Sequence, residues 1–238
     1  MAARQVDAQA PGIHGIAGVG TLAALNHRNQ TGEGQKVDIA LVDSVVASLE
    51  IITQIYLTEG RIPERIGNRY ESCYPYDTFE AKNGDVVIAA ANDKLWRLVA
   101  RVMAQPELAE RDEFKTNPLR VQNHARLKAI MEAWTRRLDV DDIVNQMLAA
   151  GVPAAPINNI DQLIADPHIA DAREMFVDIV HPIAGKLKLT GSHIKLSKTK
   201  TGLRTPSPLL GQHNAQVYGE ILGLSGADIE QLTREGVL

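Results

Sequence analysis

An Asn-Gly pair between two short β-forming runs is the feature that most limits how this chain can fold. The segment YDTFEAKNGDVVIAA, residues 76–90, alternates apolar and polar side chains before the pair and is apolar after it. Asn-Gly readily adopts the positive φ angles of tight hairpin turns. The sequence therefore predicts an antiparallel hairpin that turns at Asn83 and Gly84, with its second strand at 86–90.

Helical periodicity follows the hairpin, and two more strands follow the helices. Apolar residues recur at helical spacing in 94–103, 120–137 and 140–150, and short helices are expected at 161–164 and 167–172. The runs MFVDIVHP and GKLKLTG are typical of two strands joined by a turn. These patterns predict an α+β unit spanning residues 76–191.

A stretch without periodicity separates this unit from the residues before it. Residues 61–75 are rich in Arg, Gly, Asn and Pro, which is typical of a loop between two structural regions. The tail after Gly191 is extended and contains proline, then ends in two short helices at 215–222 and 226–235. The expected segments are 1–60, a linker at 61–75, a small α+β domain at 76–190, and a tail at 191–238 that returns to the first region.

The first region opens on an apolar run in which Gly12, Gly15 and Gly18 lie three residues apart. In a helix, this spacing leaves one stripe nearly bare of side chains and suited to close packing. A phosphate-binding loop at Gly18 and Gly20 is the alternative, although no strand precedes these glycines and no third glycine follows.

A strand and a long helix are expected next. The predicted strand covers residues 36–40, and the helix runs from Val42 to Thr58. Asp43 or Ser44 is expected to cap the start of this helix, and Gly60 to end it.

Composition excludes several classes of protein. The net charge is −4 with both signs scattered, so no basic stripe for nucleic acid and no basic membrane patch is expected. No apolar run reaches membrane-spanning length, and Cys73, the single cysteine, has no partner for a disulfide within the chain. We therefore expect a cytoplasmic protein without nucleic-acid or membrane partners.

The histidines do not indicate a metal site. None of the seven stands at metal-ligand spacing with another histidine, cysteine or carboxylate. His14 lies near the residues considered below for catalysis, and a packed or solvated imidazole is its alternative interpretation.

Three blocks, in this order, carry a resemblance to a known family. The first is LAALNHRNQTGEGQKVDIALVDS (22–44), and the second is GNRYESCYPYDTFEAKNGDVVIAAANDKLW (67–96). The third joins GVPAAPINNIDQLIADPHI to the tail PLLGQHNAQVYGEILGLSGADIEQLTREGVL. Together they resemble the family III CoA-transferases (CaiB/BaiF type), the group of carnitine- and formyl-CoA-transferases and methylacyl-CoA racemases.

The resemblance covers residues 12–238 and implies an α/β fold. It predicts part of a doubly wound large domain, built from both ends of this chain, together with the smaller α+β domain. The family's N-terminal part, with its first βαβ units and most CoA contacts, has no counterpart in the sequence. Two subunits threaded through each other as an interlocked homodimer are also implied, or pairing with a separate N-terminal half.

The same resemblance implies chemistry with coenzyme A thioesters and carboxylic acids as substrates and with no permanently bound cofactor. An aspartate would take up the acyl group as a mixed anhydride, which remains reactive toward thiolate and carboxylate. Alternatives are an acyl-CoA racemase, in which the aspartate removes a proton, and a truncated, non-catalytic homologue or partner subunit of a split transferase.

The carried-over site residues fall in two places. The family's aspartate aligns with Ala10, and Asp7 is the carboxylate nearby, so Asp7 is the candidate nucleophile; a solvated Asp7 is the alternative. Gly67 and Asn68 match the family's GN segment and are candidates for thioester contact, or for a turn that needs positive φ. Tyr74 and Tyr76 are candidates to line the same cleft, with hairpin packing as their alternative.

Overall fold

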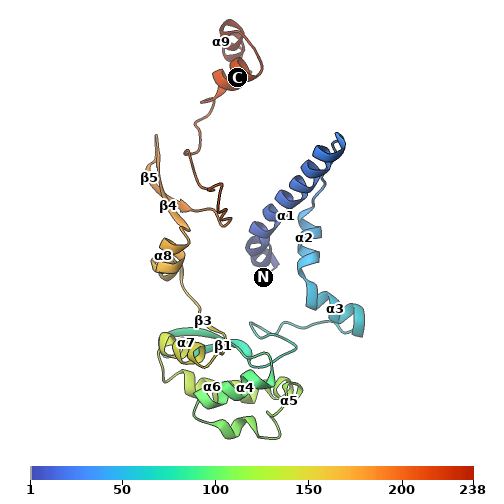
Figure 1. Ribbon diagram of the computed structural model, residues 1–238, viewed down its shortest axis with the longest axis vertical. Helices are drawn as coiled ribbons and strands as arrows, with labels where there is room; N and C mark the ends of the chain where they lie inside the picture. Colours follow the sequence, from blue (N-terminus) through green and yellow to red (C-terminus); the bar gives the residue numbers. More distant parts are fainter. Residues whose placement is uncertain (1) are drawn as a thin grey trace. The chain divides into compact units, whose positions relative to one another are not determined.

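A computed structural model describes residues 2–238; of residues 2–16 and of Glu50 it describes only the backbone (Figure 1). The chain divides into two compact units, Met1–Glu71 and Ser72–Leu238, and the division falls inside the loop expected at 61–75. That the tail returns to the first region stays a prediction.

The first unit begins with a long helix, α1 (Ala2–Thr31). It contacts α2 (Leu41–Ser48), and a Cβ atom on Gly20 would lie 3.1 Å from Cγ1 of Val37. The glycine-rich run is therefore helical, as predicted. The phosphate-loop alternative is wrong, because Gly18 and Gly20 lie inside this helix, where their amides bond to the preceding turn.

The predicted strand at 36–40 does not form. Residues 33–40 lie outside any helix or strand, and Ala40 has the extended angles φ −100° and ψ 141°. A strand needs a hydrogen-bonded neighbour, and none of the strands in the described part of the chain pairs with this segment. The segment therefore adopts an extended backbone but does not join a sheet.

The predicted helix at 42–58 is broken in two. Leu49 separates α2 from α3 (Glu50–Glu59), and the pair is bent by 71°. Neither predicted cap operates at Asp43 or Ser44: Ala40 is the N-cap, and the Ser44 hydroxyl instead donates to the Ala40 carbonyl oxygen at 3.2 Å. Gly60 ends α3 with φ +68°, as predicted.

The described residues were also considered as possible membrane-spanning helices. No single helix has the length and apolar character to cross a bilayer, whereas the bent α2–α3 pair meets the test of length and composition when its two parts are taken together.

The second unit opens with the predicted hairpin. Strands β1 (Tyr76–Ala81) and β2 (Gly84–Ala89) are antiparallel, and β3 (Ala154–Pro156) adds to the other edge of β2. Ala81 pairs with Gly84, so the turn residues are Lys82 and Asn83, one position earlier than predicted.

Helices pack on this sheet and enclose the core of the second unit. They are α4 (Asp93–Val102), the 3₁₀ turn η1 (Pro106–Ala109), α5 (Asn117–Gln122), α6 (His124–Thr135) and α7 (Val140–Ala149). The helix predicted at 120–137 is therefore divided at Asn123, whose φ of −101° and ψ of 22° interrupt it. The largest fully buried apolar side chains include Phe79, Trp96, Phe114 and Met131.

Side-chain bonds join β1 to α6. Asp77, 5% exposed, accepts from the Lys128 ammonium at 2.8 Å, and the same ammonium donates to the Thr78 carbonyl oxygen at 2.9 Å. The Thr135 hydroxyl donates to the Glu80 carbonyl oxygen at 2.6 Å. These bonds satisfy polar groups that burial would otherwise penalise.

Asn83 links the hairpin turn to the start of α7. Its Oδ1 accepts from the Val140 amide at 2.8 Å, one of the amides that a helix start leaves without a partner. We expect Asn83→Ala to lower the free energy of unfolding by about 1 kcal/mol, the typical effect of losing such a side-chain bond. Urea denaturation measures it, with Lys82→Ala in the same turn as the matched control. The Lys82 side chain makes an exposed ion pair with Asp139 at 3.3 Å, which contributes little to stability. Equal losses in both variants would contradict the role of Asn83.

The rest of the second unit carries no fully buried residue from Pro153 to Leu238. It comprises α8 (Ile160–Ala165), η2 (His168–Ala172), the antiparallel pair β4 (Phe176–His181) and β5 (Gly185–Thr190), η3 (Ala215–Ile221) and α9 (Gly226–Arg234). The predicted short helices and the second strand pair are thus confirmed. Many apolar side chains here face solvent, such as Ile183 at 76% and Leu210, which is fully exposed.

Candidate functional site

The loop that carries the GN pair is held together by local ion pairs. Arg61 bonds to Glu71 at 2.6 Å and to Glu59 at 3.4 Å, and the hydrogen bond that it donates to Glu71 raises the pKa of Arg61 above its ordinary value. Gly67 and Asn68 lie exposed between these anchors, and Gly67 has φ +74°. A left-handed φ is the backbone requirement that glycine meets without strain.

The next residues are fixed by Asn117 at the start of α5. Its side-chain amide donates to the Ser72 carbonyl oxygen at 2.8 Å, and its Oδ1 accepts from the Tyr74 amide at 3.0 Å. One asparagine thus satisfies two backbone groups of a segment without regular structure. Asn117 was not among the predicted site residues; its signal in the sequence is an Asn before Pro118 at a helix start.

Arg120 fastens the same segment from inside the core. Its side chain is 0% exposed and donates to the Tyr74 and Phe114 carbonyl oxygens at 2.7 and 3.0 Å and to Asp93 Oδ1 at 2.8 Å. The guanidinium also lies 5.8 Å from the centre of the Trp96 ring, within cation–π range. Burial lowers the pKa of Arg120, and the bond to Asp93 opposes this, so the group remains charged.

These contacts give the NDKLW block a structural role. Asn92 caps α4 by accepting from the Leu95 amide at 2.9 Å, Asp93 pairs with Arg120, and Trp96 packs beside it.

Cys73 is 8% exposed in the segment that Arg120 holds. Burial raises the pKa of the Cys73 thiol, and the positive charge of Arg120 partly opposes this. The cysteine is therefore a protonated, packed thiol at neutral pH.

The two candidate tyrosines differ in their surroundings. Tyr74 is 0% exposed and makes edge contacts with Phe79 and His124, with ring centres 6.4 and 6.1 Å apart. This is the hairpin packing considered as the alternative for Tyr74. Tyr76, at the start of β1, is 38% exposed. Contact of either tyrosine with substrate stays a prediction.

The candidate nucleophile lies in α1. Asp7, Ala10 and His14 belong to the part of this helix whose side chains are outside the described residues. The helical backbone places positions 7 and 10 about one turn apart, roughly 4.5 Å along the axis. The structure thus defines the backbone at these positions, and the role of Asp7 stays a prediction.

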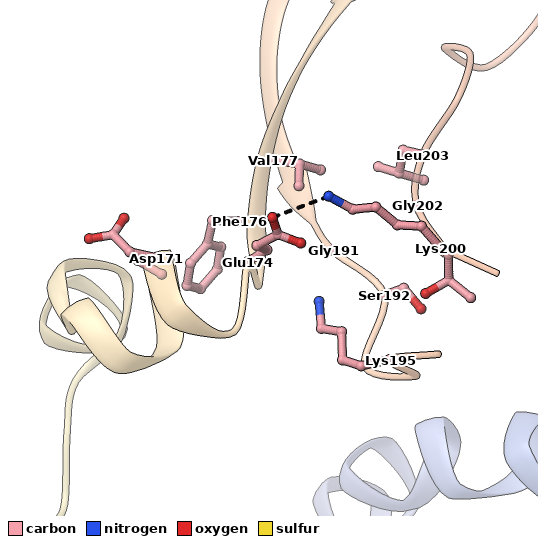
Figure 2. A pocket seen from close by; sticks show the side chains of 12 residues that line it. Asp171, Glu174, Phe176, Val177, Gly191, Ser192, Lys195, Lys200, Gly202 and Leu203 are labelled. Atoms are coloured by element: carbon pink, nitrogen blue, oxygen red, sulfur yellow. Dashed lines mark hydrogen bonds and ion pairs between the residues drawn. The ribbon is translucent and has the colours of Figure 1, made fainter. Parts of the chain in front are cut away.

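A cavity of about 510 Å³ lies in the second unit, between η2, β4 and the tail segment after Gly191 (Figure 2). The tail contributes Lys195 and Lys200, and the wall opposite contains Glu174 and Phe176. Lys200 pairs with Glu174 at 3.4 Å. No local motif in the sequence signals this cavity, because the residues that form it lie about 25 positions apart.

Among the residues that the structure describes, no three His, Cys, Asp or Glu side chains gather closely enough to hold a metal ion.

Comparison with known proteins gives a family. The family model described as "CoA-transferase family III" matches residues 5–214. The chain is 38% identical over 203 residues to the succinyl-CoA:mesaconate CoA-transferase of Haloarcula marismortui, covering 85% of this chain and 50% of that protein. It is 32% identical over 229 residues to the succinyl-CoA–L-malate CoA-transferase beta subunit of Chloroflexus aurantiacus, covering 95% and 56%.

A solved structure supports the same family relationship. A CaiB/BaiF family protein from Brucella suis superimposes with a TM-score of 0.67 at 34% identity, covering 84% of this chain and 51% of that one. The mixed α/β architecture of the chain resembles that of this protein. The chain spans about half the length of the curated relatives it matches.

Proposed function

Because this chain belongs to CoA-transferase family III, we propose that it takes part in transferring CoA from an acyl-CoA thioester to a carboxylic acid. The observation that carries the proposal is the match of 85% of the chain, at 38% identity, to a relative named as a CoA-transferase. Several relatives are named for succinyl-CoA, which makes it the first donor to test.

The proposed reaction begins with attack of a carboxylate oxygen on the thioester carbonyl carbon. The C–S bond breaks, CoA leaves as the thiolate, and a mixed anhydride keeps the acyl group activated. The thiolate then attacks the enzyme's own carbonyl in this anhydride, which releases the donor acid as its carboxylate and leaves CoA as a thioester on the enzyme's carboxyl group. The acceptor carboxylate attacks this enzyme thioester, and CoA leaves again as the thiolate. The thiolate then attacks the acceptor's carbonyl, which frees the enzyme's carboxylate. The net change is one thioester for another.

We assign the attacking carboxylate to Asp7, the acidic residue nearest the family position that reads Ala10. Gly67 and Asn68 are proposed to contact the thioester, where a backbone amide donated to the carbonyl oxygen would stabilise its developing charge. The exposure of both residues and the left-handed φ of Gly67 support this role. Tyr76, being partly exposed, is proposed to border the acyl group, and Tyr74 to position its neighbours.

The chain spans about half the length of these relatives, so the proposal includes a further polypeptide. One relative is named as a beta subunit, and a partly exposed apolar surface covers much of 153–238. We propose that a second copy of this chain, or a separately encoded half, covers that surface in the working enzyme. The doubly wound large domain and the interlocked dimer belong to this proposal.

An exchange assay tests the function. The full chain is incubated with succinyl-CoA and, separately, mesaconate, D-citramalate, L-malate or glutarate, and new thioesters are measured by liquid chromatography with mass detection. We expect one acid to become its CoA thioester as succinate appears in equal amount. Absence of exchange with every acid, both for the chain alone and after co-expression with its neighbouring reading frame, would contradict the proposal.

A further inference from the structure

The cavity beside the β4–β5 pair has a fixed backbone on one side. Glu174 adopts φ +46°, a left-handed conformation that costs a residue with a side chain about 1 kcal/mol or more. Gly191 faces it so closely that a Cβ atom there would clash with the Glu174 carbonyl oxygen. The Gly191 amide bonds to the Met175 carbonyl oxygen at 2.8 Å, which holds the two segments together. Strain of this kind is retained where the surrounding structure determines it, often at ligand sites.

The opposite side is a loop organised around one carbonyl group. The Ile194 carbonyl oxygen accepts from the Ser192 hydroxyl at 3.2 Å and from the Thr201 hydroxyl. These bonds close the segment 192–201 on itself, and Lys195 and Lys200 extend from it. Figure 2 shows both lysine side chains pointing toward Glu174 from the tail.

The charges around the cavity leave one cation without a carboxylate. Glu174 is already paired with Lys200, and Figure 2 shows the Asp171 carboxylate directed away, on the far side of Phe176. In the part of the chain that the structure describes, no carboxylate pairs with Lys195. The Lys200–Glu174 pair is long at 3.4 Å and its side chains are 81% and 55% exposed, so Lys200 can exchange Glu174 for a ligand at little cost.

Part of the remaining wall is apolar. Phe176 and Val177 from β4 and Leu203 from the tail line the cavity, and the first two are partly buried. A volume of about 510 Å³ is within the range of small-molecule sites and exceeds what a lone inorganic anion needs. We propose that this cavity binds a small organic carboxylate, with the carboxylate at Lys195 and the hydrocarbon chain on Phe176, Val177 and Leu203.

Butyrate binding to the full chain tests this site without any CoA present. We expect saturable butyrate binding that shifts the methyl signals of Val177 and Leu203 in NMR spectra of the 13C-labelled chain. Lys195→Gln should weaken this binding about tenfold, the effect of one charge-assisted hydrogen bond. Lys198→Gln is the matched control, since Lys198 lies on the same segment but does not line the cavity; we expect its affinity to be unchanged.

Three further probes separate the chemistry. n-Butylamine and butanol should not compete with butyrate, and inorganic phosphate should bind much more weakly, because it lacks a hydrocarbon chain. No saturable butyrate binding, equal weakening by Lys198→Gln, or phosphate binding as tight as that of butyrate would each overturn the proposal. The site rests on its own residues, so its failure would leave the exchange assay unaffected, and failure of that assay would leave this site intact.

Discussion

Replacement of Arg120 by methionine should lower the free energy of unfolding by about 3 kcal/mol or more. Methionine keeps most of the side-chain volume but removes all three hydrogen bonds. The Tyr74 and Phe114 carbonyl oxygens then lose a buried donor, and Asp93 loses its partner. Asp93 is 42% exposed and regains water, so the two carbonyl groups account for most of the loss.

Urea denaturation followed by tryptophan fluorescence measures this effect well. The chain's two tryptophans, Trp96 and Trp134, both belong to the core of the second unit. Arg126→Met is the matched control: Arg126 is 64% exposed and pairs with Glu113 at 3.1 Å, so its loss should cost no more than about 1 kcal/mol. Arg120→Lys should fall between the two, because one ammonium cannot reach three separate acceptors. Equal stabilities for the two methionine variants would refute the anchoring role.

Arg120 also illustrates what sequence patterns leave out. An arginine at the start of a periodic segment is typical of a solvent-facing position, and nothing local indicates that its partners are a carbonyl 46 positions earlier and a carboxylate 27 positions earlier. Asn117 is similar, since its two partners lie more than 40 positions away. Such long-range polar contacts depend on tertiary packing, which the order of residues alone does not reveal.

The elements that the sequence predicted well are those with local causes. The hairpin at Tyr76–Ala89 follows from its turn chemistry and alternation, and α4 and α7 follow from apolar periodicity with clear ends. Gly60, which the sequence predicts as a helix end, adopts a positive φ. Each of these signals lies within a few residues of the element it specifies.

The wrong predictions depend on neighbours. The segment at 36–40 has a strand-like composition, but strands form by pairing, and it has no partner among the described strands. The break at Leu49 and the interruption at Asn123 occur at residues that are neither proline nor glycine, so no local breaker residue marks them. β3 was missed because three residues ending in proline carry too little pattern to be recognised.

The candidate sites also differ in whether their signals in the sequence are local. The GN pair is a local motif, so the sequence could single it out, and its contact with the thioester stays a prediction. The cavity at Glu174 and Lys195 has no local signal, since it needs a strained residue, a close-packed glycine and a folded tail segment. The nucleophile is the opposite case. It rests on a sequence position alone, and so it needs a direct chemical test.

Replacement of Asp7 by asparagine should reduce the exchange of succinyl-CoA by about 10³-fold or more, the scale on which loss of a covalent nucleophile acts. Asparagine preserves the size of the side chain but cannot form the anhydride. Glu33→Gln, a charge removal at an exposed position beyond α1, is the control and should retain full activity. Hydroxylamine added during turnover should leave a hydroxamate at position 7 of the wild-type chain and none in the variant.

A second substitution separates Asp7 from the family position. Ala10→Asp, introduced together with Asp7→Asn, places a carboxylate about one helical turn further along α1, roughly 4.5 Å away. If Asp7 is the nucleophile of this chain, the shifted carboxylate is misaligned with the thioester, and the double variant should remain about as inactive as Asp7→Asn. Full exchange activity in Asp7→Asn, or recovery of activity by the added Asp at position 10, would show that Asp7 is not the nucleophile.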